Sequence, residues 1–165
     1  MNFLTLSAGE AVYIPADAPH AYLSGDIVEC MARSNNVLNT GFCPRPDRDD
    51  IELFTATMQF APHTAEEVIL PPTRSEKGTL GKTEAYKPEM SEFNILKTTL
   101  QRGEKEVVKA IDGPSVLFAT SGTGTLEAEG TEHEISWGYV FFVGAGIETT
   151  FVAQGGLEIY RAYAE

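Results

Sequence analysis

Residues 115–136 read SVLFATSGTGTLEAEGTEHEIS, and they show the chain's main pattern most plainly. Apolar and β-branched residues alternate with small or polar ones in three short runs, at 115–120, 124–129 and 131–136. Glycines separate the runs. Alternation with a period of two, broken by glycine, is typical of strands that bury one face. The stretch therefore predicts three consecutive β-strands joined by short turns.

The same pattern continues on both sides of this stretch. Counting outward, eight strand-like runs are found, at 93–100, 107–112, 115–120, 124–129, 131–136, 139–143, 148–153 and 157–163. Eight short strands at even spacing predict a complete jelly-roll β-sandwich, and the protein is expected to be mainly β. Four aromatic residues in these runs are expected to pack inside the sandwich: Phe118, Phe141, Phe142 and Phe151.

The N-terminal part of the chain predicts less β-structure. Runs at 10–14, 20–23 and 26–31 read as strands, and a short helix capped by Asp47 or Asp49 should follow. So few strands cannot bury both faces of a sandwich. The expected organisation is a partial β segment with a short helix over 1–60, a linker or surface connection over 61–92, and a complete jelly roll over 93–165.

Composition excludes several function classes. The 165 residues carry a formal net charge of −12, and no basic excess that could neutralise nucleic-acid phosphates is present. No apolar run is long enough to cross a bilayer, so no membrane partner is expected, and the first residues do not resemble a signal peptide. The two cysteines form no disulfide framework, and a cytoplasmic location is expected.

An internal repeat relates the two parts of the chain. Residues 7–16 and 136–145 each place a glycine turn, five strand residues and then a proline or glycine. Such self-similarity implies two related modules. In the first module the turn leads to His20, whose imidazole suits a zinc site, although a lone histidine is more often structural. The matching position of the second module holds Thr149, so the second barrel is expected to be metal-free.

The residues from Gly9 to His20 resemble the second cupin motif, in which a glycine turn and strand lead to a histidine metal ligand. Two further runs, PHAYLSGD at 19–26 and VECMA at 28–32, resemble the type I mannose-6-phosphate isomerase family. The closing strands are similar to the C-terminal cupin of that family. The resemblance covers nearly all of the chain but corresponds to only the last two-fifths or so of a full-length family member.

This resemblance implies a cupin fold and a zinc-dependent isomerase that interconverts mannose 6-phosphate and fructose 6-phosphate, in carbohydrate metabolism leading to GDP-mannose. It implies that His20 is a zinc ligand and that Tyr22 lines the substrate pocket. Glu29 is implied as a catalytic residue that handles the proton. Arg45 stands on a family lysine, where it would act in catalysis and bind the sugar phosphate.

The chain also departs from the family pattern. Asn39 stands at the catalytic arginine position and Asn35 at an aspartate position, and an amide cannot replace a guanidinium's charge. The family's other zinc ligands come from an earlier part of its sequence, so zinc is expected to bind weakly or not at all here. A C-terminal portion or diverged paralogue, inactive alone, is one reading. The alternative is a non-catalytic cupin module for sugar binding, regulation or oligomerisation, and exposed strand edges predict a homo-oligomer.

Overall fold

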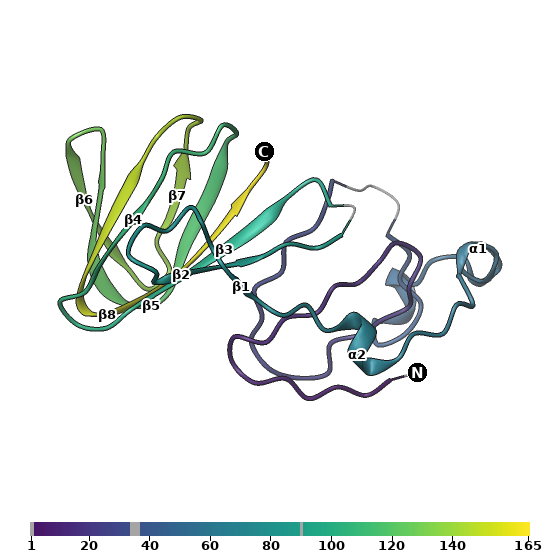
Figure 1. The fold of residues 1–165 in the computed structure, drawn as a ribbon. Helices are drawn as coiled ribbons and strands as arrows, with labels where there is room; N and C mark the ends of the chain where they lie inside the picture. Colours follow the sequence, from purple (N-terminus) through teal and green to yellow (C-terminus); the bar gives the residue numbers. More distant parts are fainter. Residues whose placement is uncertain (1, 34–36, 90) are drawn as a thin grey trace. The chain divides into compact units, whose positions relative to one another are not determined.

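The computed structural model describes residues 2–33, 37–89 and 91–165. The chain divides into two compact units, Met1–Ile69 and Leu70–Glu165. The second unit holds every strand of the described residues (Figure 1). These strands are β1 (Thr73–Arg74), β2 (Thr83–Tyr86), β3 (Asn94–Leu100), β4 (Lys105–Val108), β5 (Ser115–Ala128), β6 (Thr131–Ser136), β7 (Val140–Val143) and β8 (Thr149–Tyr163).

The strands pair antiparallel throughout, in the order β1-β2-β3-β8-β5-β6, with β4 added to β8 and β7 added to β5. The two long strands each take part in both layers. The first part of β8 pairs with β4 and its last part with β3. Similarly, the first part of β5 pairs with β7 and its last part with β6. The result is a two-layer sandwich joined through bent strands, which confirms the predicted mainly β jelly-roll fold.

Glycine makes the bend of β5 possible. The β5–β8 register shifts between Ala119 and Ser121 and again between Gly122 and Gly124. At Gly122 φ is +80°, and a Cβ there would lie 1.9 Å from the Gly156 carbonyl oxygen. Only glycine can occupy such a position, because any side chain would collide with backbone. The glycines between the predicted runs therefore bend continuous strands, and six strands replace the eight runs.

The core follows from the alternation along these strands. On β8 the inward side chains include Phe151, Leu157 and Ile159, and they pack with Leu96 and Leu117. Each such burial removes apolar surface from water and stabilises the fold by about 1.5–3 kcal/mol. This cluster is the core of the second unit.

The prediction that four phenylalanines lie inside was correct only in part. Phe151 is 1% exposed, and Phe141 packs against the core from its edge. Phe118 is half-buried and stacks on Tyr160. Phe142 is 74% exposed, so its predicted place inside was wrong. Neighbouring residues of a strand point to opposite faces, and Phe141 and Phe142 therefore cannot both face inward.

The structure differs from the surface connection expected over residues 61–92. The boundary between the two units falls after Ile69, and β2 within this stretch pairs with β3. Three of the four β2 residues, Thr83, Ala85 and Tyr86, are buried. Prolines and charged residues on either side of this short strand conceal its pattern in the sequence.

The first unit contains helical elements and loops: the 3₁₀ helix η1 (Arg45–Asp47), α1 (Ile51–Thr57) and α2 (Ala65–Val68). The helix was predicted, but its cap is Asp50, whose carboxylate accepts hydrogen bonds from the Glu52 and Leu53 amides. The three strands predicted before it were wrong. A single bridge between Val12 and Ile69 is the β-pairing found in the described part of this unit. Too few partner strands are available there to build a ladder.

Candidate functional site

His20 follows a tight turn in which the Ala18 amide donates to the Pro15 carbonyl (3.4 Å). Its Nδ1 atom lies 3.0 Å from the Ala18 carbonyl oxygen. A carbonyl oxygen can only accept, so Nδ1 carries the hydrogen and the lone pair remains on Nε2. Metal-binding histidines commonly have this arrangement, with one ring nitrogen fixed by a backbone carbonyl. The imidazole is exposed and suitable as one metal ligand.

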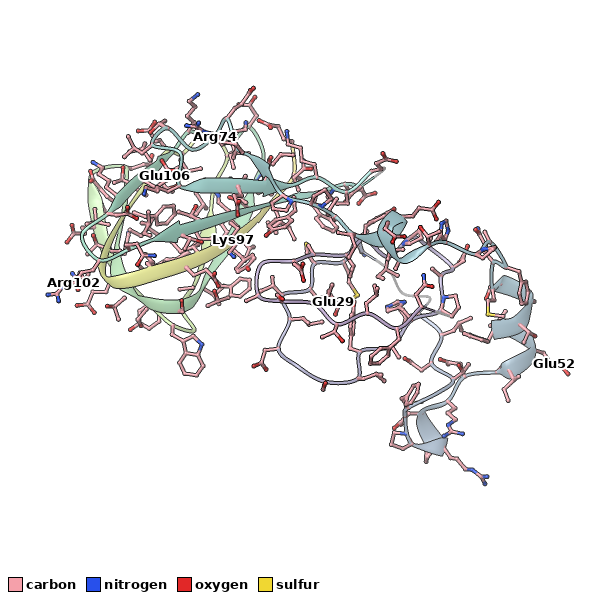
Figure 2. All side chains as sticks on the ribbon, turned by 60° about the horizontal axis from the view of Figure 1, so that its bottom comes forward. Glu29, Glu52, Arg74, Lys97, Arg102 and Glu106 are labelled. Carbon is pink, nitrogen blue, oxygen red and sulfur yellow. The ribbon has the colours of Figure 1, made fainter. Side chains whose placement is uncertain are left out.

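Tyr22 and Glu29 lie beside His20. The rings of His20 and Tyr22 meet edge to face, with centroids 5.7 Å apart, and the Tyr22 hydroxyl donates to Glu29 Oε1 (3.2 Å). Partial burial raises the pKa of the Tyr22 phenol, and the charge and hydrogen bond of Glu29 raise it further. The structure therefore brings three of the predicted site residues together. Glu29 lies on a loop of the first unit (Figure 2).

Asn39 and Arg45 lie elsewhere in the first unit. The backbone amide of Asn39 donates to Asp49 Oδ2 (2.6 Å), and the backbone amide of Asp49 donates to the backbone carbonyl of Asn39 (2.7 Å). Arg45 begins η1 and its side chain is exposed. Within residues 2–33, 37–89 and 91–165, no hydrogen bond or ion pair joins either residue to His20, Tyr22 or Glu29. Asn35 lies outside the described residues.

A complete zinc site does not fit this part of the chain. Zinc in proteins takes about four ligands, drawn mainly from cysteine, histidine and acidic residues. Across the described residues, no group of three or more His, Cys, Asp and Glu side chains is placed to hold a metal ion. The described side chains therefore do not form a tetrahedral centre by themselves.

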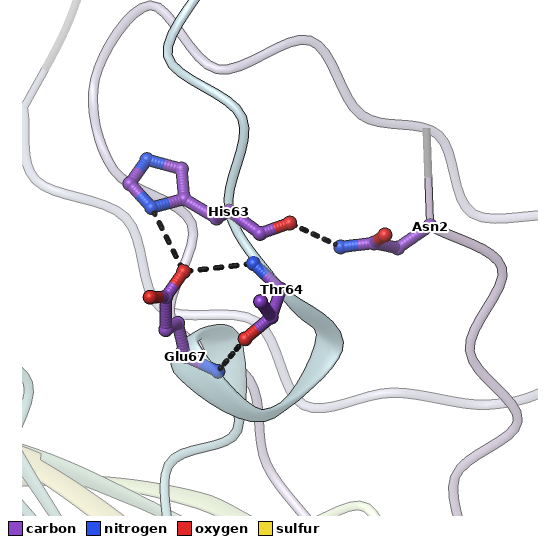
Figure 3. Close-up of polar contacts among 4 residues, drawn as sticks. All are labelled: Asn2, His63, Thr64 and Glu67. Carbon is purple, nitrogen blue, oxygen red and sulfur yellow. Dashed lines mark hydrogen bonds and ion pairs between the residues drawn. The ribbon is translucent and has the colours of Figure 1, made fainter.

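A small pocket lies on the turn before His20, lined by Pro15, Ala16, Ala18, Pro19, Gln59, Ala61 and His63. One of its residues, His63, is held in place (Figure 3). Its Nδ1 lies 3.6 Å from Glu67 Oε2, its carbonyl accepts from Asn2, and Thr64 and Glu67 cap α2 reciprocally. His63 therefore has local structural contacts, and nothing in the sequence pattern had connected it to the turn.

The second unit contains a buried polar cluster that the sequence interpretation missed. Arg161 is 2% exposed, and it donates to Ser115 and Thr149, both also buried. A signal was present, because Arg161 has the same strand parity as Ile159 and Tyr163, which face inward.

No helix in the described ranges is both long and apolar enough to cross a membrane. The two-layer antiparallel sandwich, together with the glycine–proline turn that presents His20, defines a protein of the cupin class. Residues 86–131 match the family model described as "Phosphomannose isomerase type I C-terminal". A solved cupin protein from Bacteroides fragilis aligns with a TM-score of 0.43 and 12% identity, over 46% of this chain and 68% of that one.

The chain is homologous over its whole length to type I mannose-6-phosphate isomerases, and it corresponds to their C-terminal portion. It is 39% identical to the mannose-6-phosphate isomerase of Cryptococcus neoformans, covering 100% of this chain and 37% of that protein. It is 38% identical to the mannose-6-phosphate isomerase of Schizosaccharomyces pombe, covering 100% of this chain and 40% of that protein. The chain thus spans about two-fifths of the length of these relatives. The family resemblance predicted from residues 19–32 is confirmed.

Proposed function

We propose that this chain supplies the C-terminal part of a mannose-6-phosphate isomerase site and is inactive by itself. The single observation that supports this is the hydrogen bond from His20 Nδ1 to Ala18, which leaves Nε2 able to bind a metal ion. Zinc is the metal proposed from the family. Its remaining ligands would come from another polypeptide segment, since the described residues hold no group of three or more metal-binding side chains.

The neighbours of His20 suit the chemistry of an aldose–ketose isomerase. That reaction moves a proton between C1 and C2 of the sugar, and a carboxylate is a suitable base. Glu29 would move the proton, while the Tyr22 hydroxyl bound to it holds its carboxylate in position. Arg45 has no side-chain partner among the described residues and would bind the sugar phosphate. Asn39 brings no charge to the family's arginine position.

A chimera tests the proposal. The chain would be fused to the N-terminal three-fifths of the S. pombe relative, and fructose 6-phosphate formation would be measured with zinc present. We expect no activity from the isolated chain, weak activity from the chimera, and a gain of about 10²–10³-fold on Asn39→Arg. His20→Ala in the chimera should remove both activity and zinc binding. A robust rate from the isolated chain, or a His20→Ala chimera that retains zinc and activity, would sink the proposal.

The alternative is a non-catalytic module that binds a second copy of itself. The observation in its favour is the number of large apolar side chains that the first unit exposes, among them Phe42 (86%) and Phe60 (80%). Sedimentation of the isolated chain discriminates this alternative, because it requires a dimer or larger species whether or not the chimera is active.

Cys30 and Cys43 are free thiols, which supports the proposed cytoplasmic location.

A further inference from the structure

Arg161 lies inside the sandwich with more hydrogen-bond donors than acceptors. Its Nε donates to Ser115 Oγ (2.9 Å) and its Nη1 to Thr149 Oγ1 (3.0 Å). Its Nη2 is buried and has no hydrogen-bond partner in the described part of the chain. The Ser115 hydroxyl in turn donates to the Val143 carbonyl (3.4 Å). For the hydrogen of the Thr149 hydroxyl, no acceptor is found among the described residues.

The positive charge of this arginine is also uncompensated. None of the ion pairs in the described residues includes Arg161. Burial lowers the pKa of Arg161 to about 10, and Tyr163 opposes that shift. The guanidinium therefore remains protonated at neutral pH. An unpaired buried charge of this kind is strongly destabilising, and proteins normally pair it with an opposite charge.

The three residues come from distant points of the long strands. Ser115 begins β5, Thr149 begins β8, and Arg161 stands near the end of β8. The bend of β8 brings its two ends to one interior point. In the internal repeat, Thr149 matches His20, so a hydroxyl beside a guanidinium replaces an imidazole at this position. The fixed positive charge repels a metal cation and attracts an anion.

We propose that the interior of the second unit is a binding site for one small monovalent anion, held by Nη2 of Arg161 and the hydroxyl of Thr149. One negative charge neutralises the single guanidinium. The three side chains are each at most 3% exposed, so the site is shielded from solvent and a small ion such as chloride is the proposed occupant. The proposal is independent of isomerase activity and of His20.

Urea unfolding at constant ionic strength tests the proposal, with sodium gluconate replaced stepwise by sodium chloride. For wild type we expect a saturable stabilisation, in which the ratio of folded to unfolded protein rises about 100-fold when chloride reaches 100 times its Kd. Arg161→Met should abolish the chloride dependence. In gluconate alone, the stability of this variant should equal or exceed that of wild type. Thr149→Val should weaken chloride binding several-fold.

Arg102→Met is the matched control, because it removes the same charge from a residue on the exposed turn before β4 (Figure 2). It should keep the full chloride response. If Arg161→Met does not fold, chlorine NMR line broadening by wild type, reduced in Thr149→Val, decides the question. A wild type without chloride dependence, an equal response in Arg161→Met, or protection by phosphate but not by chloride would each overturn the proposal.

Discussion

The two units of this chain divide stability and chemistry between them. The second unit contains the strand ladders and all of the buried residues in the described part of the chain, among them Leu96, Leu117 and Phe151. The first unit contains His20, Tyr22 and Glu29, yet none of its described residues is buried. The residues that suggest an enzyme therefore lie where the chain has least core of its own.

This contrast is a consequence of strand number. A strand needs a neighbour for its backbone groups and a second layer for its apolar face. In the second unit β5 and β8 provide neighbours for β3, β4, β6 and β7. In the first unit the Tyr13 amide reaches Val68, but the pairing goes no further than the Val12 bridge.

The sharpest test of the contrast substitutes one phenylalanine in each unit. Phe151→Ala should destabilise the protein by about 3–5 kcal/mol, because it leaves a cavity among fully buried neighbours. Phe42→Ala, at a side chain that is 86% exposed, should change stability by no more than about 0.5 kcal/mol. Urea unfolding monitored by circular dichroism measures both. Equal losses would mean that the first unit has a core contribution of its own.

A second comparison uses two carboxylates that each accept hydrogen bonds from backbone amides. Glu106 accepts the amides of Leu80 (2.7 Å) and Lys82 (2.6 Å) and is fully buried, while Asp50 accepts two amides at the exposed start of α1. Glu106→Ala should cost about 3 kcal/mol, since it leaves these two amides and the buried Thr83 hydroxyl without this acceptor. Asp50→Ala should cost about 1 kcal/mol, confined to the helix.

The measurement for this pair is amide hydrogen exchange. Loss of Glu106 should accelerate exchange across the second unit, whereas loss of Asp50 should affect only amides near α1. Glu132→Gln, on the exposed face of β6, is the control for removing a carboxylate from a strand and should be within about 0.5 kcal/mol of wild type. A Glu106→Ala protein as stable as this control would contradict the burial argument.

The sequence predicted the β-sandwich well because alternation survives in single strands, and the bounds predicted for β6 match the structure. It did not predict that β5 and β8 are continuous. Glycine between two strand-like runs has two physical uses, a turn or a bulge, and the partner strand decides which is used. Gly122 is a bulge because the Gly156 carbonyl lies against it, a contact between residues far apart in sequence.

The candidate site was predictable to a similar extent. The runs at 19–26 and 28–32 carried the family resemblance, and Tyr22 lies against both His20 and Glu29 in the structure. The roles assigned to these three residues stay predictions. The sequence could not reveal that Asn39 and Asp49 bind each other's backbone, because that pairing depends on the loop closing around η1. Arg161 was overlooked because the inward positions of a strand are recognised from apolar residues. A charged residue at such a position does not fit that pattern and is taken to face solvent.

The smallest expected effect concerns pH and lies within the second unit. A hydrogen bond from Lys82, aided by the Gln101 amide, lowers the pKa of the Glu104 carboxyl. A lowered folded-state pKa means that the unfolded chain binds more protons, so this contribution is present above the unfolded pKa and is lost as the pH falls through the folded one. Between about pH 6 and pH 3, wild-type stability should therefore fall more steeply than that of Glu104→Gln.

Lys82→Met should also make the fall of stability over this pH range shallower, because it removes the partner of Glu104. The double variant should show no further change in that pH dependence. The pH-dependent loss of stability should appear in the unfolding of the second unit's strands. Hydrogen exchange of the α1 amides should not change, because the ion pair lies within the second unit. Parallel acid limbs for wild type and Glu104→Gln would show that solvent screens this pair completely.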